Sequence, residues 1–479
     1  MNTQVIPFHY NRSQVSAGIV HIGVGNFHRA HEAFFTDKLL AAGERTWGIC
    51  GVMLLPGDER LYHALRKQDN TYTLTVCGRD GKDVTYRIGS LVELIWGVEN
   101  PQSVFDRIAD PAVKIITLTI TEGGYNLDKH SGEFILDNED VLHDLKNQHL
   151  PKTVFGFVAE GLRRRKEAGA GALTVLSCDN LQHNGNTAKQ AFSSFIAVQD
   201  AALAGWISQN VSFPNSMVDR ITPAVTPADI ERLNLKNGSD DAAPVYCEDF
   251  IQWVVEDKFI AGRPAWEQVG AEFTDDVTAY ENMKLSLLNA SHTMLAYPAF
   301  LSGYRKVDDA VRDPRFARYL RAFMDKDITP YVPAPGNTDL ELYKQTLVER
   351  FANRSVSDQL SRLCADGVSK IPVYLMPNLI KMIRDKADFS RVAFLFAAYR
   401  RYLQCKTDDN GALYEINEPQ LTAQDPDLIA SDEPVDFLGL SPFLSADLKV
   451  AGAFVEKYLQ MTDAIKAKGI ISVLESILL

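Results

Sequence analysis

The fold is decided by one stretch near the N-terminus, Gly18-Ile19-Val20-His21-Ile22-Gly23-Val24-Gly25-Asn26-Phe27-His28. Its first five residues predict a buried strand, and residues 31–42 predict a helix that Gly43 ends. Between the two, glycines permit a tight turn whose backbone N–H groups can approach a pyrophosphate at a helix N-terminus. The stretch therefore predicts a dinucleotide-binding turn, and the residues that we expect to contact the dinucleotide are Gly23, Gly25, Asn26 and Phe27.

The third glycine of the usual dinucleotide fingerprint is replaced here by His28. Taken alone, the pattern therefore also fits an ordinary tight turn between a strand and a helix. The order of strand, turn and helix close to the N-terminus favours the dinucleotide interpretation.

A second predicted strand, residues 47–54, leads into Pro56-Gly57-Asp58. A dinucleotide fold needs a carboxylate near this point to accept hydrogen bonds from the adenosine ribose hydroxyls, and Asp58 fits that need. The same carboxylate would repel a 2′-phosphate, which favours NAD over NADP. Asp58 would also suit a plain turn after Pro-Gly, and Arg60 is a nearby cation that could weaken the discrimination.

Outward from this stretch, strand and helix signals alternate through the first half of the chain and give way to helices in the second. Alternation of this kind predicts a mostly parallel sheet covered on both faces. We expect an α/β protein with a Rossmann-type N-terminal domain, residues 1–277, and a mostly α-helical C-terminal domain, residues 278–479. The other expected elements are strands at 113–120 and 172–177, a hairpin of 72–76 with 84–88, helices at 154–168, 281–301, 313–324, 340–351, 356–364, 389–403 and 446–467, and a surface loop at 407–436.

The bulk properties narrow the class of protein. The 479 residues are too many for one compact core, and the net charge of -13 makes nucleic acid an unfavourable partner. The six cysteines show neither C-x-x-C spacing nor clustered histidines beside them, which favours a reducing, cytoplasmic location. The longest apolar run, residues 392–399, is far shorter than the roughly 18 residues of a membrane span.

Four polar residues that suit alcohol oxidation share one predicted helix: Glu281, Lys284, Asn289 and His292. At about 100° per residue they fall within an arc of about 140°, so one helix face can present them to one pocket. A lysine in such a helix is otherwise a solvated side chain with a buried stem, and the pattern alone does not separate these two interpretations.

Oxidation of an alcohol removes a hydroxyl proton while hydride leaves the carbon. A lysine can act as the base if desolvation and nearby cations lower its pKa, and asparagine amides can donate to the developing alkoxide. Tyr280-x-x-x-Lys284 matches the Tyr-Lys pair of short-chain dehydrogenases, but those chains are much shorter and their pair lies nearer the glycine turn. No cluster of zinc ligands is evident, so we expect a zinc-independent mechanism with no metal.

Several long motifs in the same order make the chain resemble the mannitol dehydrogenase family, the polyol-specific long-chain dehydrogenases. The resemblance runs from about residue 17 to at least residue 400. Its motifs are His21-Ile22-Gly23-Val24-Gly25-Asn26-Phe27-His28-Arg29-Ala30-His31, Thr119-Ile120-Thr121-Glu122-Gly123-Gly124-Tyr125, Ser177-Cys178-Asp179-Asn180, Met217-Val218-Asp219-Arg220-Ile221-Thr222-Pro223 and Lys284 with Asn289 and His292.

The resemblance implies a role for each of these positions and an active site in the cleft between the two domains. It makes Lys284 the general base, Asn180 and Asn289 the oxyanion hole, His292 the residue that orients the substrate, and Glu281 the gate of a proton path to solvent. It also implies that Asp219, Arg362 and Lys370 bind substrate hydroxyls, that Glu122 lies near the nicotinamide, and that the protein is a monomer.

The substrate that the resemblance implies is a polyol, oxidised with NAD to a ketose. The segment Arg362-Leu363-Cys364-Ala365-Asp366-Gly367-Val368-Ser369-Lys370 is similar to that of family members that convert D-mannitol to D-fructose. Fructuronate reductase (D-mannonate oxidoreductase) and D-arabinitol 4-dehydrogenase activities are the alternatives within the family. A non-catalytic NAD-binding regulator is the alternative from another class, and the intact set of Lys284, Asn289, His292 and Asn180 opposes it.

Overall fold

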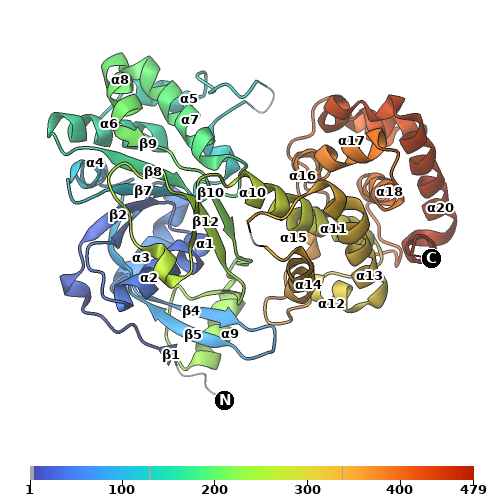
Figure 1. Ribbon diagram of the computed structural model, residues 1–479, viewed down its shortest axis with the longest axis horizontal. Coiled ribbons are helices and arrows are strands. Elements are labelled where there is room, and N and C mark those ends of the chain that lie inside the picture. Colours follow the sequence, from blue (N-terminus) through green and yellow to red (C-terminus); the bar gives the residue numbers. More distant parts are fainter. Residues whose placement is uncertain (1–4, 129–130, 337, 479) are drawn as a thin grey trace. The chain divides into compact units, whose positions relative to one another are not determined.

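The structure is a computed structural model that describes residues 5–128, 131–336 and 338–478. The chain divides into two compact units, Met1–Thr278 and Ala279–Leu479. The boundary expected from the sequence, after residue 277, differs from this division by one residue. Figure 1 follows the chain from blue, through the sheets of the first unit, to red at the end of the second.

The first unit is built on a six-stranded sheet in which every pair of neighbouring strands is parallel. The strand that precedes the glycine turn, β2, has β3 on one side and β7 on the other, so the chain order reverses there, as in dinucleotide-binding folds. The expected Rossmann-type sheet is confirmed. In spatial order the strands are β6 (Leu91–Trp96), β3 (Gly48–Met53), β2 (Ala17–Ile22), β7 (Ile115–Leu118), β8 (Leu173–Ser177) and β9 (Val211–Ser212).

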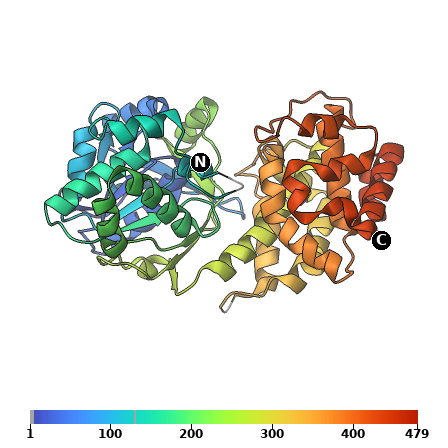
Figure 2. The same cartoon turned by 90° about the horizontal axis from the view of Figure 1, so that it is seen from above.

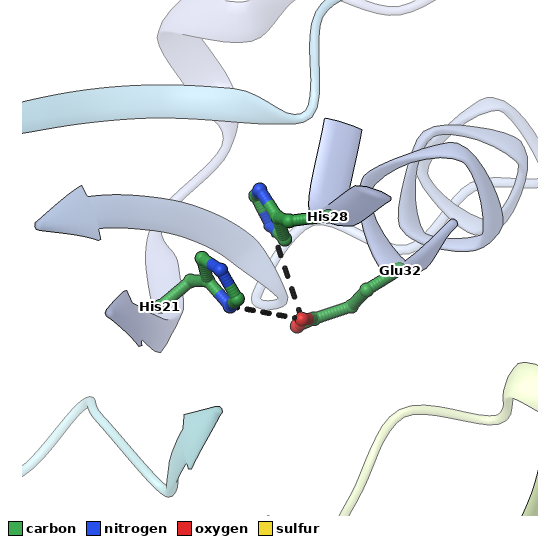
Figure 3. A group of neighbouring side chains, drawn as sticks. All are labelled: His21, His28 and Glu32. Carbon is green, nitrogen blue, oxygen red and sulfur yellow. Dashed lines mark ion pairs between the residues drawn. The ribbon is translucent and has the colours of Figure 1, made fainter. Parts of the chain in front are cut away.

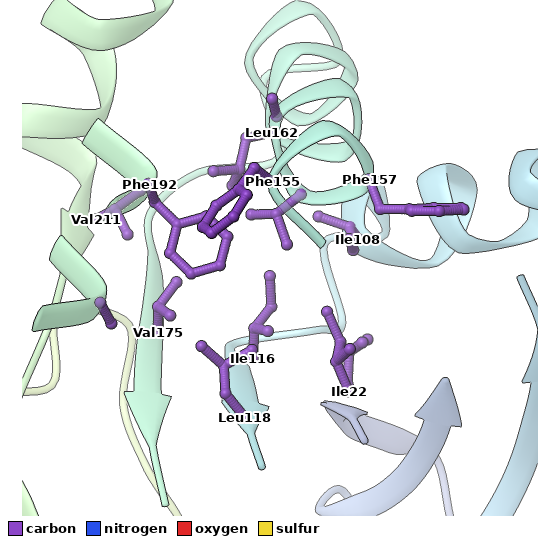
Figure 4. Close-up of a cluster of buried hydrophobic side chains, with 14 of the residues drawn as sticks. Ile22, Ile108, Ile116, Leu118, Phe155, Phe157, Leu162, Val175, Phe192 and Val211 are labelled. Carbon is purple, nitrogen blue, oxygen red and sulfur yellow. The ribbon is translucent and has the colours of Figure 1, made fainter. Parts of the chain in front are cut away.

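Both faces of this sheet are covered, which is why β2 and β3 consist of buried residues from end to end. One face packs against helices, as Figure 4 shows for Ile22, Ile116 and Phe155. On the other face, Ile19 of β2 packs with Phe34 and other residues. The helices of the first unit are α1 (Asn26–Ala30), α2 (Glu32–Ala41), α3 (Glu59–Lys67), α4 (Pro101–Ala109), α5 (Glu139–Lys146), α6 (Val154–Glu167), α7 (Asn184–Gln199), α8 (Ala201–Asn210) and α9 (Pro227–Asn237).

Two smaller sheets complete the first unit, and the sequence predicts only part of them. The expected hairpin is confirmed as antiparallel β4 (Tyr72–Cys77) and β5 (Val84–Ile88), which join β1 (Val5–Ile6) and β11 (Val245–Glu248) in one sheet. The other sheet has β12 (Gln252–Glu256) between β10 (Ser216–Asp219) and β13 (Glu272–Thr274). The helix expected at 31–42 is confirmed as α2, and the sequence missed the short α1 before it, from which α2 is separated by a break at His31 (φ −120°, ψ −91°).

The second unit is built of helices, as both views show (Figure 1, Figure 2). Its central helix, α11, is buried almost all round and contacts α15 and α18. The expected loop at 407–436 contains one helix, α19, and the helix expected at 356–364 begins only at Leu360. The helices are α10 (Thr278–Lys284), α11 (Ala290–Leu301), α12 (Val307–Arg312), α13 (Pro314–Ala322), α14 (Leu340–Phe351), α15 (Leu360–Cys364), α16 (Gly367–Tyr374), α17 (Met376–Arg384), α18 (Ser390–Cys405), α19 (Asp425–Ala430) and α20 (Gly452–Ser476).

Among the residues that the structure describes, no helix combines the length and hydrophobicity that a membrane span requires.

Candidate active site

The glycine turn has a backbone that only glycine can supply at its first position. Gly23 has φ +100°, and a Cβ there would lie 2.1 Å from the carbonyl oxygen of Thr119. Gly25 is exposed, and a Cβ there would meet nothing closer than the Gly23 carbonyl oxygen at 3.9 Å. A side chain at Gly23 would therefore clash with the protein, whereas the space beside Gly25, directly before α1, is free. A pyrophosphate can approach the backbone of such a turn.

The predicted residues of the first unit gather at one edge of the main sheet. Gly23 follows β2, Asp58 follows β3, Glu122 follows β7 and Asn180 follows β8. Because these four strands are neighbours and parallel, their carboxyl ends lie at the same edge, around the point where the strand order reverses. Glu122 and Asn180 are exposed there. Asp219, by contrast, ends β10 in a different sheet and is only 4% exposed.

Asn26 and Phe27 are held by the first unit itself. The Asn26 amide donates to the carbonyl oxygen of Pro223 (3.3 Å), and its own oxygen accepts from the Arg29 guanidinium (2.6 Å). The Phe27 ring stacks on His31 with 4.9 Å between ring centroids. Both side chains thus fix the start of α1, and their predicted contact with a cofactor stays a prediction.

Asp58 lies where a ribose-binding carboxylate is expected. It ends the short turn Pro56–Asp58 after β3 and stands directly before α3. Burial raises the pKa of this half-buried carboxyl above its ordinary value. A partly desolvated acceptor at the end of the second strand fits the adenosine ribose of a dinucleotide.

Asp179 is a residue of this edge to which the sequence argument assigned no role. Its carboxylate accepts from the backbone N–H groups of Ile120 (3.1 Å) and Thr121 (2.8 Å) and from the Tyr125 hydroxyl (2.7 Å). Burial raises its pKa. Asp179 thereby ties the loop that carries Glu122 to the strand end that carries Asn180, its neighbour in sequence. That adjacency is the signal that could have identified it.

Behind the turn, a buried polar cluster of His21, His28 and Glu32 supports the glycines (Figure 3). His21 Nδ1 lies 3.1 Å from a Glu32 carboxylate oxygen, and His21 Nε2 lies 3.1 Å from the Gly23 carbonyl oxygen. The His28 ring stacks on His21, with 3.4 Å between centroids and 9° between planes. The residue in place of the third glycine is therefore accommodated by flat stacking against the strand.

This cluster corrects the expectation that no group of metal-ligating residues exists, because its ligand atoms all lie within 4.8 Å of one another. Its geometry nevertheless disfavours an ion shared by both rings. The lone pair of an imidazole nitrogen lies in the ring plane, and two stacked parallel planes do not converge on one point. Burial, followed by the charges of His21, Arg29 and His31, lowers the pKa of His28 well below its ordinary value, although its Nε2 lies 3.8 Å from a Glu32 carboxylate oxygen.

In the second unit, the predicted catalytic residues lie on one continuous helical segment. Glu281 (3% exposed) lies in the middle of α10 and Lys284 (7%) ends it, and His292 on α11 stacks against Phe351 with centroids 4.2 Å apart. The uniform α-helical spacing assumed from the sequence is wrong here. Between α10 and α11, Leu285–Asn289 form a π-helical turn, in which the Ala290 N–H donates to the carbonyl oxygen of Leu285.

Arg362 pairs with the carboxylate of Asp358, whose pKa the His292 imidazole also influences. The Arg362 guanidinium donates to Asp358 through two nitrogens, with Nε 2.8 Å from Oδ1. Although burial opposes the shift, the Arg362 guanidinium and, more weakly, the His292 imidazole hold the pKa of Asp358 below its ordinary value. Sequence reasoning missed Asp358, although its position four residues before Arg362 is the spacing of a helical ion pair.

Lys370 caps the helix that carries Arg362. Its ammonium donates to the carbonyl oxygens of Ala365 (2.6 Å) and Leu363 (3.3 Å) at the end of α15. Burial, followed by repulsion from the Arg362 guanidinium, lowers the pKa of Lys370. The chain turns at Asp366, which has φ +55°, and α16 begins at Gly367.

Each of the two units of the chain matches the model of a known family domain. The family model of the mannitol dehydrogenase Rossmann domain matches residues 17–268, and that of the mannitol dehydrogenase C-terminal domain matches residues 276–466. The chain belongs to the mannitol dehydrogenase family.

Relatives of the chain within this family match it over nearly its full length. The polyol:NADP oxidoreductase of Gluconobacter oxydans (strain 621H) is 40% identical over 98% of this chain and 96% of its own length. Among solved structures, a D-sorbitol dehydrogenase in substrate-free form has a TM-score of 0.91 and 39% identity, covering 98% of this chain and 99% of that one. The ternary complex of Pseudomonas fluorescens mannitol 2-dehydrogenase with NAD and D-mannitol has a TM-score of 0.89 and 42% identity, covering 99% of this chain and 97% of that one.

As a mannitol dehydrogenase family member, the chain is an oxidoreductase that acts on a polyol CH–OH group, as the sequence predicts. The dinucleotide-binding turn described above is part of the Rossmann domain of this family.

Proposed function

We propose that this mannitol dehydrogenase family member oxidises D-mannitol to D-fructose with NAD, without zinc, and that Lys284 is the general base. The observation that carries the proposal is the buried position of Lys284 on the helical segment that also bears Asn289 and His292. The set is that of an alcohol-oxidising site, because it offers a base, neutral donors and a binder of hydroxyls.

The cofactor is NAD, which when bound accepts the hydride. Gly23 and Gly25 would admit its pyrophosphate, Asn26 and Phe27 would fix the start of the helix beside it, and Asp58 would accept from its ribose hydroxyls. Glu122 would lie toward the nicotinamide. One relative is named for NADP, but the partly buried carboxyl of Asp58 supports NAD for this chain, since it would repel a 2′-phosphate.

Five side chains handle the hydroxyl proton and the negative charge that develops on the substrate oxygen. Lys284 takes the hydroxyl proton, and its side chain is buried on the helical segment that also bears Asn289 and His292. Asn180 and Asn289 donate to the alkoxide as it forms, without adding charge. His292 orients the hydroxyl, and Glu281 passes the proton on toward solvent.

The groups that bind the remaining hydroxyls are Arg362, Lys370 and Asp219. Arg362 uses Nε and one terminal nitrogen on Asp358, and its side chain is 55% exposed, so it keeps further N–H donors for a ligand. A hydroxyl-rich chain suits such donors. D-Mannonate (fructuronate reductase activity) and D-arabinitol are the alternatives, and Arg362 in its segment supports the mannitol type.

We also propose a cytoplasmic location. Support comes from the cysteines, because all six are free thiols in the described chain and five of them are buried.

A substrate panel tests the proposed function. We expect kcat/KM to be highest for D-mannitol with NAD when D-mannitol, D-arabinitol, D-sorbitol and D-mannonate are each assayed with NAD and with NADP. The reason is that Arg362 and Lys370 meet hydroxyls along a six-carbon chain and Asp58 rejects the 2′-phosphate. A preference for D-mannonate, or for NADP over NAD, would contradict the substrate or the cofactor assignment respectively.

A further inference from the structure

The helical segment that carries Lys284, the proposed base, and Asn289, the proposed alkoxide donor, changes from α-helix to π-helix between these two residues. Lys284 ends α10, Leu285–Asn289 form the π-helical turn, and α11 begins at Ala290. A π turn closes its hydrogen bond over five residues instead of four, is rare, and occurs often at functional sites. Such a turn is retained in a helix only if something stabilises it.

The π turn alters which residues share a side of the helix. In an uninterrupted α-helix, Asn289 would lie about 140° around the axis from Lys284. Because a π turn holds one residue more, residues five apart lie nearly one above the other, and Lys284 and Asn289 are five apart. The extra residue therefore turns the Asn289 amide toward the side of Lys284.

We infer that this π turn sets the Lys284 amine and the Asn289 amide on one side of the helix, and that Asn378 is a positioning residue that holds the turn through Ser286. The inference rests on the proposed function, since it takes Lys284 as the base and Asn289 as the alkoxide donor.

The hydrogen bond between Ser286 and Asn378 fixes the turn from outside. Ser286 lies within the π turn and is 8% exposed, and its hydroxyl oxygen accepts from the Asn378 amide at 2.9 Å. Asn378 is 3% exposed and belongs to α17, some ninety residues further along the chain. Breaking a hydrogen bond between two buried side chains is costly, because each polar group is then left without a partner and without contact with water.

The surroundings of the turn are themselves held firmly. It contacts α16 and a second π-helical turn, Phe323–Ile328, on which α17 also packs. That second turn carries Asp327, which is fully buried and accepts from the Arg391 guanidinium at 2.7 Å. Asn378 therefore reaches Ser286 from a helix whose own position is fixed, so the bond can define where the turn lies.

The Asn289 side chain has an atom available for a ligand. Its Oδ1 is buried and has no hydrogen-bond partner among the residues that the structure describes. An amide oxygen accepts hydrogen bonds, so the unpaired atom is an acceptor. A buried unpaired acceptor is costly, and the hydroxyl of a bound polyol would satisfy it by donating to it.

Three variants test the inference: Asn378→Leu, Ser286→Ala and the double variant. We expect each single change to lower kcat for D-mannitol about 10- to 100-fold and to leave KM for NAD within about twofold, because misplacing a catalytic group by about 1 Å costs this much. The double variant should lose no more than the worse single, since both remove the same bond. The pH profile of kcat should shift in all three, because the surroundings of Lys284 change.

The control is Tyr458→Phe, which removes a partly buried hydrogen bond of the second unit, from the hydroxyl of the buried Tyr458 to the Pro434 carbonyl oxygen (3.0 Å). It should lower Tm about as much as the test variants and leave kcat and its pH profile unchanged. Thermal unfolding and circular dichroism of all variants establish that they are folded, and Ser286→Ala supplies the kinetic test if Asn378→Leu does not fold.

The inference is overturned if folded Asn378→Leu or Ser286→Ala keeps the kcat and the pH profile of the unchanged enzyme, or if the two losses multiply in the double variant. Such a result leaves the proposed function standing, provided that Lys284→Ala is inactive. If Lys284→Ala stays active, the proposed function itself fails.

Discussion

Replacing Lys284 with alanine should lower kcat for D-mannitol oxidation by about 10²- to 10⁴-fold, the range that a general base supplies. The Kd of NAD should stay within about twofold, because the dinucleotide-binding turn and Lys284 belong to different units of the chain and the base acts only in the chemical step. Steady-state kinetics over a range of pH, together with a fluorescence titration of NADH, give the two quantities.

Lys344 provides the matched control for this substitution. Like Lys284 it is a buried lysine of the second unit, 5% exposed, but it lies on α14 and pairs with Asp325 and Glu341. Lys344→Ala should lower Tm and leave kcat close to that of the unchanged enzyme. If Lys284→Ala keeps more than about a tenth of kcat at every pH, Lys284 is not the base.

Replacing Arg362 with alanine should lower kcat/KM for D-mannitol by about 10- to 100-fold, the scale of a lost charge-assisted hydrogen bond. Most of the loss should be in KM for the polyol, with a smaller fall in kcat, because binding of remote hydroxyls helps to orient the reacting C–H. The KM for NAD should not change. The loss should be much smaller for a simple secondary alcohol, which has no remote hydroxyls.

Arg312 offers a control with the same sequence spacing, because it pairs with Asp308 four residues earlier, as Arg362 pairs with Asp358. Arg312→Ala removes an ion pair of this kind from α12 and should leave both alcohols unaffected. Equal losses on D-mannitol and on the simple alcohol in Arg362→Ala would mean that Arg362 is structural and acts through its ion pair with Asp358.

Much of the first unit follows from the sequence because its signals are local. A strand, two glycines and a helix define the turn at Gly23, and the residues that follow each parallel strand meet at one edge, which places Asp58, Glu122 and Asn180 together. The two small sheets do not follow in this way, because their strands are short and pair with partners far away in sequence, as Val245–Glu248 do with β4.

In the second unit, the residue types of the site could be predicted and their arrangement could not. The spacing of Lys284, Asn289 and His292 in the sequence predicts that they share a helix. Residue propensities do not predict where a π-helical turn interrupts that helix. Asn378 lies far along the chain from Ser286, and their contact exists only in the folded unit. Long-range contacts of this kind have no signature in a single sequence.

The central claim is that this mannitol dehydrogenase family member transfers hydride from C2 of D-mannitol to NAD. D-Mannitol has equivalent C2 and C5 positions, so substrate deuterated at both can be incubated with the protein and NAD, and both products can be analysed by mass spectrometry and NMR. The account predicts NADH with one deuterium at nicotinamide C4 and D-fructose that keeps the other at C5. Unlabelled NADH, or no reduction of NAD in the presence of D-mannitol, would contradict it.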